Sequence, residues 1–126
     1  MAEPMGQPSP ILDVRVTREG DILVVGVAGE LDIDTTPEVR ATIVSKLVEH
    51  PSALVFDLSG VSFFSSAGLS LLLEVRGRVD TLAVVATGRA VLRPIQLTAL
   101  GSLLTVFDSV DEALASVAST QGVHRD

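Results

Sequence analysis

The amino-acid sequence predicts a single α/β domain in which helices pack on a mixed, mostly parallel β-sheet. Three observations lead to this prediction. The chain has 126 residues, enough for one hydrophobic core and too few for two. Hydrophobic residues make up 47% of it, which is typical of a globular protein. After an opening pair of strands, strand patterns and helix patterns alternate along the chain, which is the order of elements in α/β folds.

The first two strands are predicted to form a hairpin. In residues 11–18, apolar and polar side chains alternate, and this period of two indicates a half-buried strand near the edge of a sheet. Gly20 and Asp21 are typical turn residues. Residues 22–28 are almost wholly apolar, as expected for a strand that is covered on both faces.

The first helix is predicted to begin near Thr35, which has the spacing of a capping box with Glu38. Pro37 suits the first helical turn, and Pro51 marks the end of the helix. The apolar residues recur every four positions, so they form one stripe along the helix. They are Val39, Ile43 and Leu47.

The other elements continue the alternation of strands and helices. Ser109 and Glu112 form a second capping box, which predicts a last helix that ends near Ser119. The elements before it are a strand (53–58), a loop (59–64), a helix (66–77), a strand (82–86), a short helix (90–100) and a strand (103–107).

The helix over residues 66–77 carries more leucines than one helix face can hold. The spacing of Leu69, Leu72 and Leu73 predicts that these three share the face toward the core. Leu71 and Val75 would point elsewhere, and burial against a neighbouring helix explains them more simply than contact with a partner does.

The two ends of the chain are predicted to lie outside the domain. Residues 1–10 contain three prolines and no pattern of a signal peptide, so we expect a disordered tail there, a domain over residues 11–120 and a polar tail over 121–126. No apolar run reaches the roughly 18 to 20 residues of a membrane helix. The absence of cysteine fits a cytoplasmic protein.

Composition and motifs argue against several classes of function. A net charge of −7 is unfavourable for binding nucleic acid, because phosphates attract clustered cations, but it suits a protein partner with a basic patch. The chain has no phosphate-binding glycine motif, and its histidines, His50 and His124, have no plausible nucleophile nearby in the sequence. We therefore expect no enzyme activity, no catalytic residue and no cofactor.

An acidic cluster follows the second strand. Glu30, Asp32 and Asp34 could contact a partner or a metal ion, but they lack an octahedral ligand set. A solvated turn that leads into a capped helix explains them more simply, so we expect no bound metal.

The most informative segment is DLSGVSFFSSAGLSLLLEVRGRV, residues 57–79. Two serines stand at the predicted start of a helix, where unpaired N–H groups favour a phosphate. Ser65 is the expected cap, which leaves the hydroxyl of Ser66 free to point outward. Gly68 permits the close approach of another group. From residue type alone, both serines could instead serve only as caps.

Three segments, taken in order, add to this interpretation: GELD (29–32), LVFDLSGVSFFSSAGL (54–69) and LRPIQLTALGSLLTVFDSVDEAL (92–114). Their order and spacing resemble those of the STAS domain, and most closely those of the bacterial anti-sigma-factor antagonists. The resemblance covers roughly residues 11–118. It implies a STAS-like fold with about four helices on the sheet.

The resemblance also assigns roles to residues. In that family, the helix begins Asp-Ser-(Ser/Thr/Ala)-Gly-Leu, and the Ser is phosphorylated by an anti-sigma factor that is also a serine kinase. Ser66 corresponds to this acceptor, whereas Ser65 replaces the Asp and adds a second hydroxyl that could be modified. The implied partner-binding residues are Glu30, Leu31, Asp32, Ser65, Ser66, Ala67, Gly68 and Leu69.

The resemblance therefore implies an anti-sigma-factor antagonist. Unphosphorylated at Ser66, it would bind the anti-sigma factor kinase and free a sigma factor for transcription, and a PP2C-type phosphatase would reverse the modification. The alternative is a STAS binding module of a transporter or signalling complex that is not phosphorylated.

Overall fold

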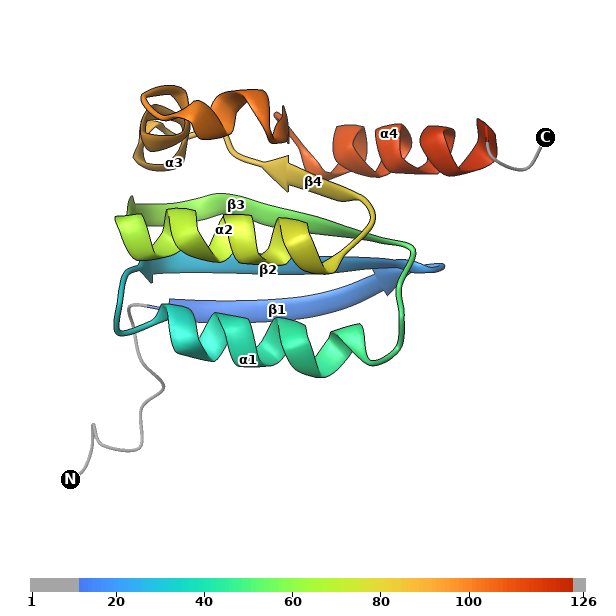
Figure 1. The fold of residues 1–126 in the computed structure, drawn as a ribbon, viewed down its shortest axis with the longest axis horizontal. Coiled ribbons are helices and arrows are strands. Elements are labelled where there is room, and N and C mark those ends of the chain that lie inside the picture. Colours follow the sequence, from blue (N-terminus) through green and yellow to red (C-terminus); the bar gives the residue numbers. More distant parts are fainter. Residues whose placement is uncertain (1–11, 124–126) are drawn as a thin grey trace.

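A five-stranded mixed β-sheet organises the fold of residues 12–123, the part of the chain that the computed structural model describes (Figure 1). The strands lie side by side in the order of the sequence. β1 and β2 form an antiparallel hairpin, and β2 to β5 are parallel, which confirms the predicted sheet. The strands are β1 (Leu12–Glu19), β2 (Ile22–Leu31), β3 (Ala53–Phe64), β4 (Leu82–Val85) and β5 (Thr105–Phe107).

Helices cover both faces of the sheet. Within the described residues, these are α1 (Thr36–Leu47), α2 (Ser66–Arg78), α3 (Arg89–Gln96) and α4 (Val110–Val123), with a short 3-10 helix, η1 (Ala99–Ser102). Alternate residues of the inner strands point to opposite faces, so the sheet has two cores. The larger core packs against α1, α2 and α3, and the smaller one packs against α4.

The predicted hairpin turn between β1 and β2 is confirmed. Gly20 has a φ of +64°, a conformation that glycine adopts without the steric cost that other residues pay. β1 lies at the edge of the sheet, as its alternating pattern indicates.

The predicted loop over residues 59–64 is wrong, because β3 continues through it to Phe64. Pairing with β2 extends as far as Leu31, which lies opposite Phe64, and it passes two register shifts on the way. The predicted strand stopped at residue 58 because these irregularities interrupt the regular alternation of side chains. The extension brings the end of β3 beside the end of β2.

The predicted core face of α2 also needs correction. Leu73 is 43% exposed, whereas Leu71 and Val75 are almost fully buried. The buried residues of α2 have the spacing i, i+3, i+4, i+7 of a single helix face, and the first of them is a glycine, which adds no apolar side chain to the sequence pattern. They are Gly68, Leu71, Leu72 and Val75.

The C-terminal third differs from the sequence prediction in its boundaries. The single helix predicted over residues 90–100 is divided into α3 and η1, and β5 is shorter than residues 103–107. The backbone N–H of Glu112 donates to Ser109 Oγ over 3.1 Å, as the capping box predicts. α4 continues to Val123, so the chain is still helical after residue 120, where the tail was predicted to begin.

The predicted N-terminal tail, residues 1–10, and residues 124–126 lie outside the described part. Over residues 12–123, no helix combines the length and the apolar character needed to cross a bilayer.

Candidate functional site

The candidate site lies where β2 and β3 end and α1 and α2 begin. Because the two strands are parallel, their carboxyl ends meet at the same edge of the sheet. A short turn of residues 32–35 leads from β2 into α1, and Ser65 alone joins β3 to α2. The pairing of Leu31 with Phe64 therefore places the starts of both helices next to each other.

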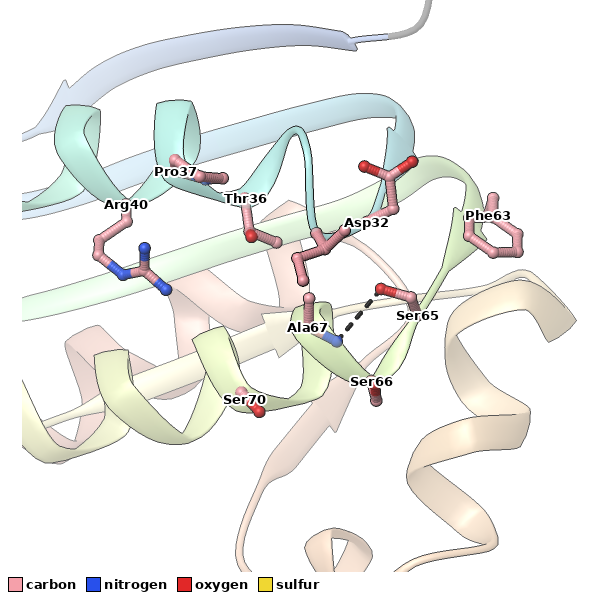
Figure 2. Close-up of a pocket in the computed structure, with 10 residues that line it drawn as sticks. Asp32, Thr36, Pro37, Arg40, Phe63, Ser65, Ser66, Ala67 and Ser70 are labelled. Atoms are coloured by element: carbon pink, nitrogen blue, oxygen red, sulfur yellow. Dashed lines mark hydrogen bonds between the residues drawn. The ribbon is translucent and has the colours of Figure 1, made fainter.

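Ser65 anchors the start of α2. Its Oγ accepts a hydrogen bond from the backbone N–H of Ala67 over 3.2 Å, which is the predicted N-cap (Figure 2). The Ser65 backbone N–H donates to the carbonyl oxygen of Leu31 over 3.0 Å, and its hydroxyl donates to the same oxygen over 3.3 Å. Ser65 thus ties the helix to the end of β2, and its side chain is half-buried.

Ser66 is the first residue of α2 and is exposed. Its hydroxyl has no hydrogen-bond partner within residues 12–123. In Figure 2 the side chain points away from the turn that precedes α1. Ser66 therefore presents a hydroxyl group to solvent at the end of the helix that favours negative charge.

The acidic turn is held by its own side chains. Asp32 Oδ1 accepts from the backbone N–H groups of Asp34 and Thr35, over 2.9 and 3.0 Å. Thr35 Oγ1 donates to the carbonyl oxygen of Glu30 over 2.8 Å and accepts from the N–H of Asp32 over 2.9 Å. The predicted capping box is therefore wrong, because these bonds engage the Thr35 hydroxyl within the turn, and it makes no cap bond to α1.

The carboxylates of this turn carry unmatched charge. No cation within residues 12–123 forms an ion pair with Glu30, Asp32 or Asp34. The described part of the chain also contains no group of three or more side chains placed to hold a metal ion. The turn is therefore a source of negative potential at the surface.

A pocket of about 730 Å³ opens between the two helix starts. Figure 2 shows Phe63 at one end of it and Arg40 at the other, with α2 along its lower side. Both candidate serines line it, and the side chain of Ser66 points away from the turn before α1 (Figure 2). The lining residues are Asp32, Ile33, Thr36, Pro37, Arg40, Phe63, Ser65, Ser66, Ala67 and Ser70.

Six of the lining residues are not among the predicted partner-binding residues: Ile33, Thr36, Pro37, Arg40, Phe63 and Ser70. Two of them are large apolar side chains in contact with solvent, since Ile33 is 76% exposed and Phe63 is 51% exposed. Ile33 carried a signal in the sequence, because it stands between two aspartates in a turn, where burial is difficult. Phe63 lies in residues 59–64, for which the sequence predicts a loop.

Arg40 joins α1 to α2. Its Nε donates to Glu74 Oε1 over 2.8 Å, and Arg78 Nη2 donates to Glu74 Oε2 over 3.1 Å. The hydrogen bond from Arg40 lowers the pKa of the Glu74 carboxyl below its ordinary value, and the bond from Arg78 acts in the same direction. Arg40 thus shares the single carboxylate of Glu74 with Arg78.

Six of the eight predicted partner-binding residues are at least partly exposed, and two are buried. Leu31 is fully buried and contributes only its carbonyl oxygen, to Ser65. Gly68 is buried against Phe64, whose Cε1 would lie 2.7 Å from a Cβ at that position. These two residues support the surface from below. The other six are Glu30, Asp32, Ser65, Ser66, Ala67 and Leu69.

Comparisons with known proteins agree with this geometry. The model of the STAS domain family matches residues 13–113. The anti-sigma-F factor antagonist RsfB of Mycobacterium tuberculosis (strain H37Rv) is 34% identical over 116 residues, which cover 90% of this chain and 94% of RsfB. The same identity and coverage are found for RsfB of strain CDC 1551.

Solved structures show the same fold. The crystal structure of an anti-sigma factor antagonist from Mycobacterium paratuberculosis is similar, with a TM-score of 0.83 and 34% identity, over 87% of this chain and 97% of that one. The unphosphorylated form of the anti-sigma factor antagonist SpoIIAA has a TM-score of 0.73 and 18% identity, over 85% and 97% of the two chains, and shares the fold. The chain therefore belongs to the STAS domain family, among the bacterial anti-sigma factor antagonists.

Proposed function

We propose that this chain binds an anti-sigma factor that is also a serine kinase, and that phosphorylation of Ser66 by this kinase prevents binding. The bound anti-sigma factor would release its sigma factor, which could then join RNA polymerase. The observation that carries the proposal is the exposed, unbonded hydroxyl of Ser66 at the start of α2, beside the acidic turn. The names of the relatives, anti-sigma-F factor antagonists, support the choice of partner.

The proposed docking surface is formed by the start of α2 together with the turn before α1. Its side chains come from Glu30 at the end of β2, from Asp32 in the turn and from Ser66, Ala67 and Leu69 in α2. Leu31 and Gly68 would support this surface without touching the partner, because both are buried.

The chemistry of the switch is a phosphoryl transfer. The γ-phosphoryl group of ATP, bound to the kinase, is transferred to Ser66 Oγ, the hydroxyl proton is lost and ADP leaves. Ser66 is a better acceptor than Ser65, since Ser65 Oγ is engaged in two hydrogen bonds and is half-buried. A PP2C-type phosphatase would remove the phosphate and restore binding.

A local charge is sufficient for this switch. The phosphate adds about −1.5 to −2 charge at neutral pH. A thousandfold loss of affinity corresponds to about 4 kcal/mol, a cost that one desolvated and unmatched phosphate can supply. The neighbouring carboxylates of Glu30, Asp32 and Asp34 have no cation partners within residues 12–123, so this acidic region brings no cation that could pair with the phosphate. No conformational change is required.

A second function is favoured by one observation. Ser65 stands where the resembling antagonists have an aspartate next to the acceptor, so a carboxylate close to Ser66 is missing. The alternative is a STAS module that binds its partner constitutively, without phosphorylation.

Labelled ATP separates the two functions. The purified chain is incubated with the anti-sigma factor that co-purifies with it from its own cells, and the incorporated phosphate is mapped by mass spectrometry. We expect kinase-dependent label on wild-type protein and none on Ser66→Ala. Ser70→Ala is the matched control, because Ser70 is an exposed serine one turn further along α2 in the same pocket. Binding without label supports the constitutive module, and label that persists in Ser66→Ala would refute the assignment of the acceptor.

A further inference from the structure

We propose that Ile33 and Phe63 are the apolar anchors of the docking surface, and that they receive an apolar side chain which basic residues flank on the partner. This inference rests on the proposed function and deepens it, because it states the chemistry that the anti-sigma factor must present. It concerns residues that belong to neither the acceptor motif nor the acidic residues singled out from the sequence.

Two large apolar side chains are exposed at one pocket. Ile33 is 76% exposed and Phe63 is 51% exposed, and both line the 730 Å³ pocket that also contains Ser66. Ile33 comes from the turn before α1, and Phe63 comes from the end of β3. Exposed apolar side chains that line one concavity are the arrangement that binds an inserted side chain.

The fold itself does not need the side chain of Ile33. The turn that contains it is held by hydrogen bonds of Asp32 and Thr35, and Ile33 makes none of them. An isoleucine in a solvated turn gains no burial in the isolated protein, where a polar residue would serve as well. Burial becomes available to it when a partner covers the pocket.

The charges around the anchors identify the partner's chemistry. The carboxylates of Asp32 and Asp34 flank Ile33 in the turn, and Glu30 lies at the end of β2. None of the three has a cation partner within the described residues. At the other end of the pocket, Arg40 is engaged in an ion pair with Glu74, which it shares with Arg78. The surface near the anchors is therefore negative, and its complement is an apolar side chain between lysines or arginines.

The location of Ser66 in the same pocket links the anchors to the switch. The partner's cations would be paired with the carboxylates that are already present, so a phosphate on Ser66 would add negative charge with no match. It would also bring a hydrated dianion to a pocket that an apolar side chain must enter, and its desolvation would oppose that insertion.

The test of the anchors is the affinity of the purified anti-sigma factor for single variants, measured by isothermal titration calorimetry. Ile33→Ser and Phe63→Ser should each lower the affinity by about 30-fold or more, the loss typical of a central anchor. Phe63→Leu, which keeps an apolar side chain, should recover most of it. Thermal unfolding of each variant confirms that the fold is retained.

Val48→Ser is the matched control for Ile33→Ser. Val48 is 71% exposed and also β-branched, but it lies after the last residue of α1, at the end opposite the pocket. Its replacement should leave the affinity unchanged. Losses in Ile33→Ser and Phe63→Ser no larger than in Val48→Ser would overturn the inference.

The basic character of the partner has its own test, the association rate as a function of salt concentration. Asp34→Asn should slow association several-fold at low salt and have little effect at high salt. Glu19→Gln removes the same charge from an exposed site at the opposite end of the sheet and should have a smaller effect. Equal effects of the two variants would overturn the assignment of a basic partner surface.

The failure of this inference can be told apart from the failure of the proposed function. If wild-type protein does not bind the anti-sigma factor, the proposed function itself fails. If Ile33→Ser and Phe63→Ser bind with the same affinity as wild-type protein, only the assignment of the anchors fails.

Discussion

Gly68 and Phe64 fit together at the junction of β3 and α2. A Cβ at position 68 would lie 2.7 Å from Phe64 Cε1 and 2.8 Å from Cδ1. Phe64 is only 7% exposed, so its ring cannot move away without disturbing the core. The contact fixes the first turn of α2, and with it the position of Ser66.

Gly68→Ala should therefore destabilise the protein, by about 1–3 kcal/mol, the range for overpacking a close-packed site. The free energy of unfolding, from urea denaturation followed by circular dichroism, measures the effect. Gly77→Ala is the control within the same helix. A Cβ there would meet no atom within 4 Å, and alanine should stabilise α2 by up to about 1 kcal/mol. Equal changes in both variants would contradict this account of Gly68.

At the residue scale, the sequence predicted the contacts that depend on near neighbours. Ser65 caps α2 and Ser66 is exposed because both properties follow from the local start of the helix. Thr35 was predicted incorrectly as a capping-box residue. Its hydroxyl donates to the carbonyl oxygen of Glu30, five residues earlier. The capping-box motif considers only the residues that follow the cap, so it does not predict this acceptor.

The turn between β2 and α1 is the element that shapes the acidic side of the pocket. Thr35 is 8% exposed, and its hydroxyl bonds to the backbone of both Glu30 and Asp32. Asp32 in turn bonds to the backbone of Asp34 and Thr35. These bonds hold the carboxylates and Ile33 in one arrangement before any partner arrives.

Thr35→Val should loosen this turn, because valine keeps the shape of threonine but leaves the Glu30 carbonyl and the Asp32 N–H without the hydroxyl. We expect a loss of about 1–3 kcal/mol in stability and faster hydrogen exchange at the Asp32 amide. Thr35→Ser keeps the hydroxyl and should exchange at close to the wild-type rate. Identical exchange rates in the two variants would show that the hydroxyl does not hold the turn.

At the element scale, the order of strands and helices could be predicted, and several boundaries could not. The extension of β3 to Phe64 escaped prediction because Val61 and Phe64, both buried, are three residues apart rather than two. The register shifts against β2 produce this spacing, and they depend on the pairing of distant segments. The side of α2 that faces the core was predicted incorrectly because it includes Gly68, which has no side chain to mark that side in the apolar pattern.

At the scale of the whole molecule, the sequence predicted the family and the region of the candidate site. Both predictions rest on the order and spacing of three segments, residues 29–32, 54–69 and 92–114. The pocket could not be predicted in the same way. Its lining comes from the turn before α1, from α1 itself, from the end of β3 and from α2, and only the folded sheet brings these segments together. The exposed side chains of Ile33 and Phe63 at one pocket, and the ion pair of Arg40 with Glu74, became visible only with that arrangement.

The central claim is that one phosphate on Ser66 decides whether the assembled surface can dock, without a change in fold. The measurement that tests it most directly is the affinity of the anti-sigma factor for unphosphorylated protein and for protein fully phosphorylated at Ser66. We predict a loss of about a thousandfold on phosphorylation, equivalent to about 4 kcal/mol, with amide chemical-shift changes confined to residues near the pocket. Equal affinities of the two forms would contradict the account.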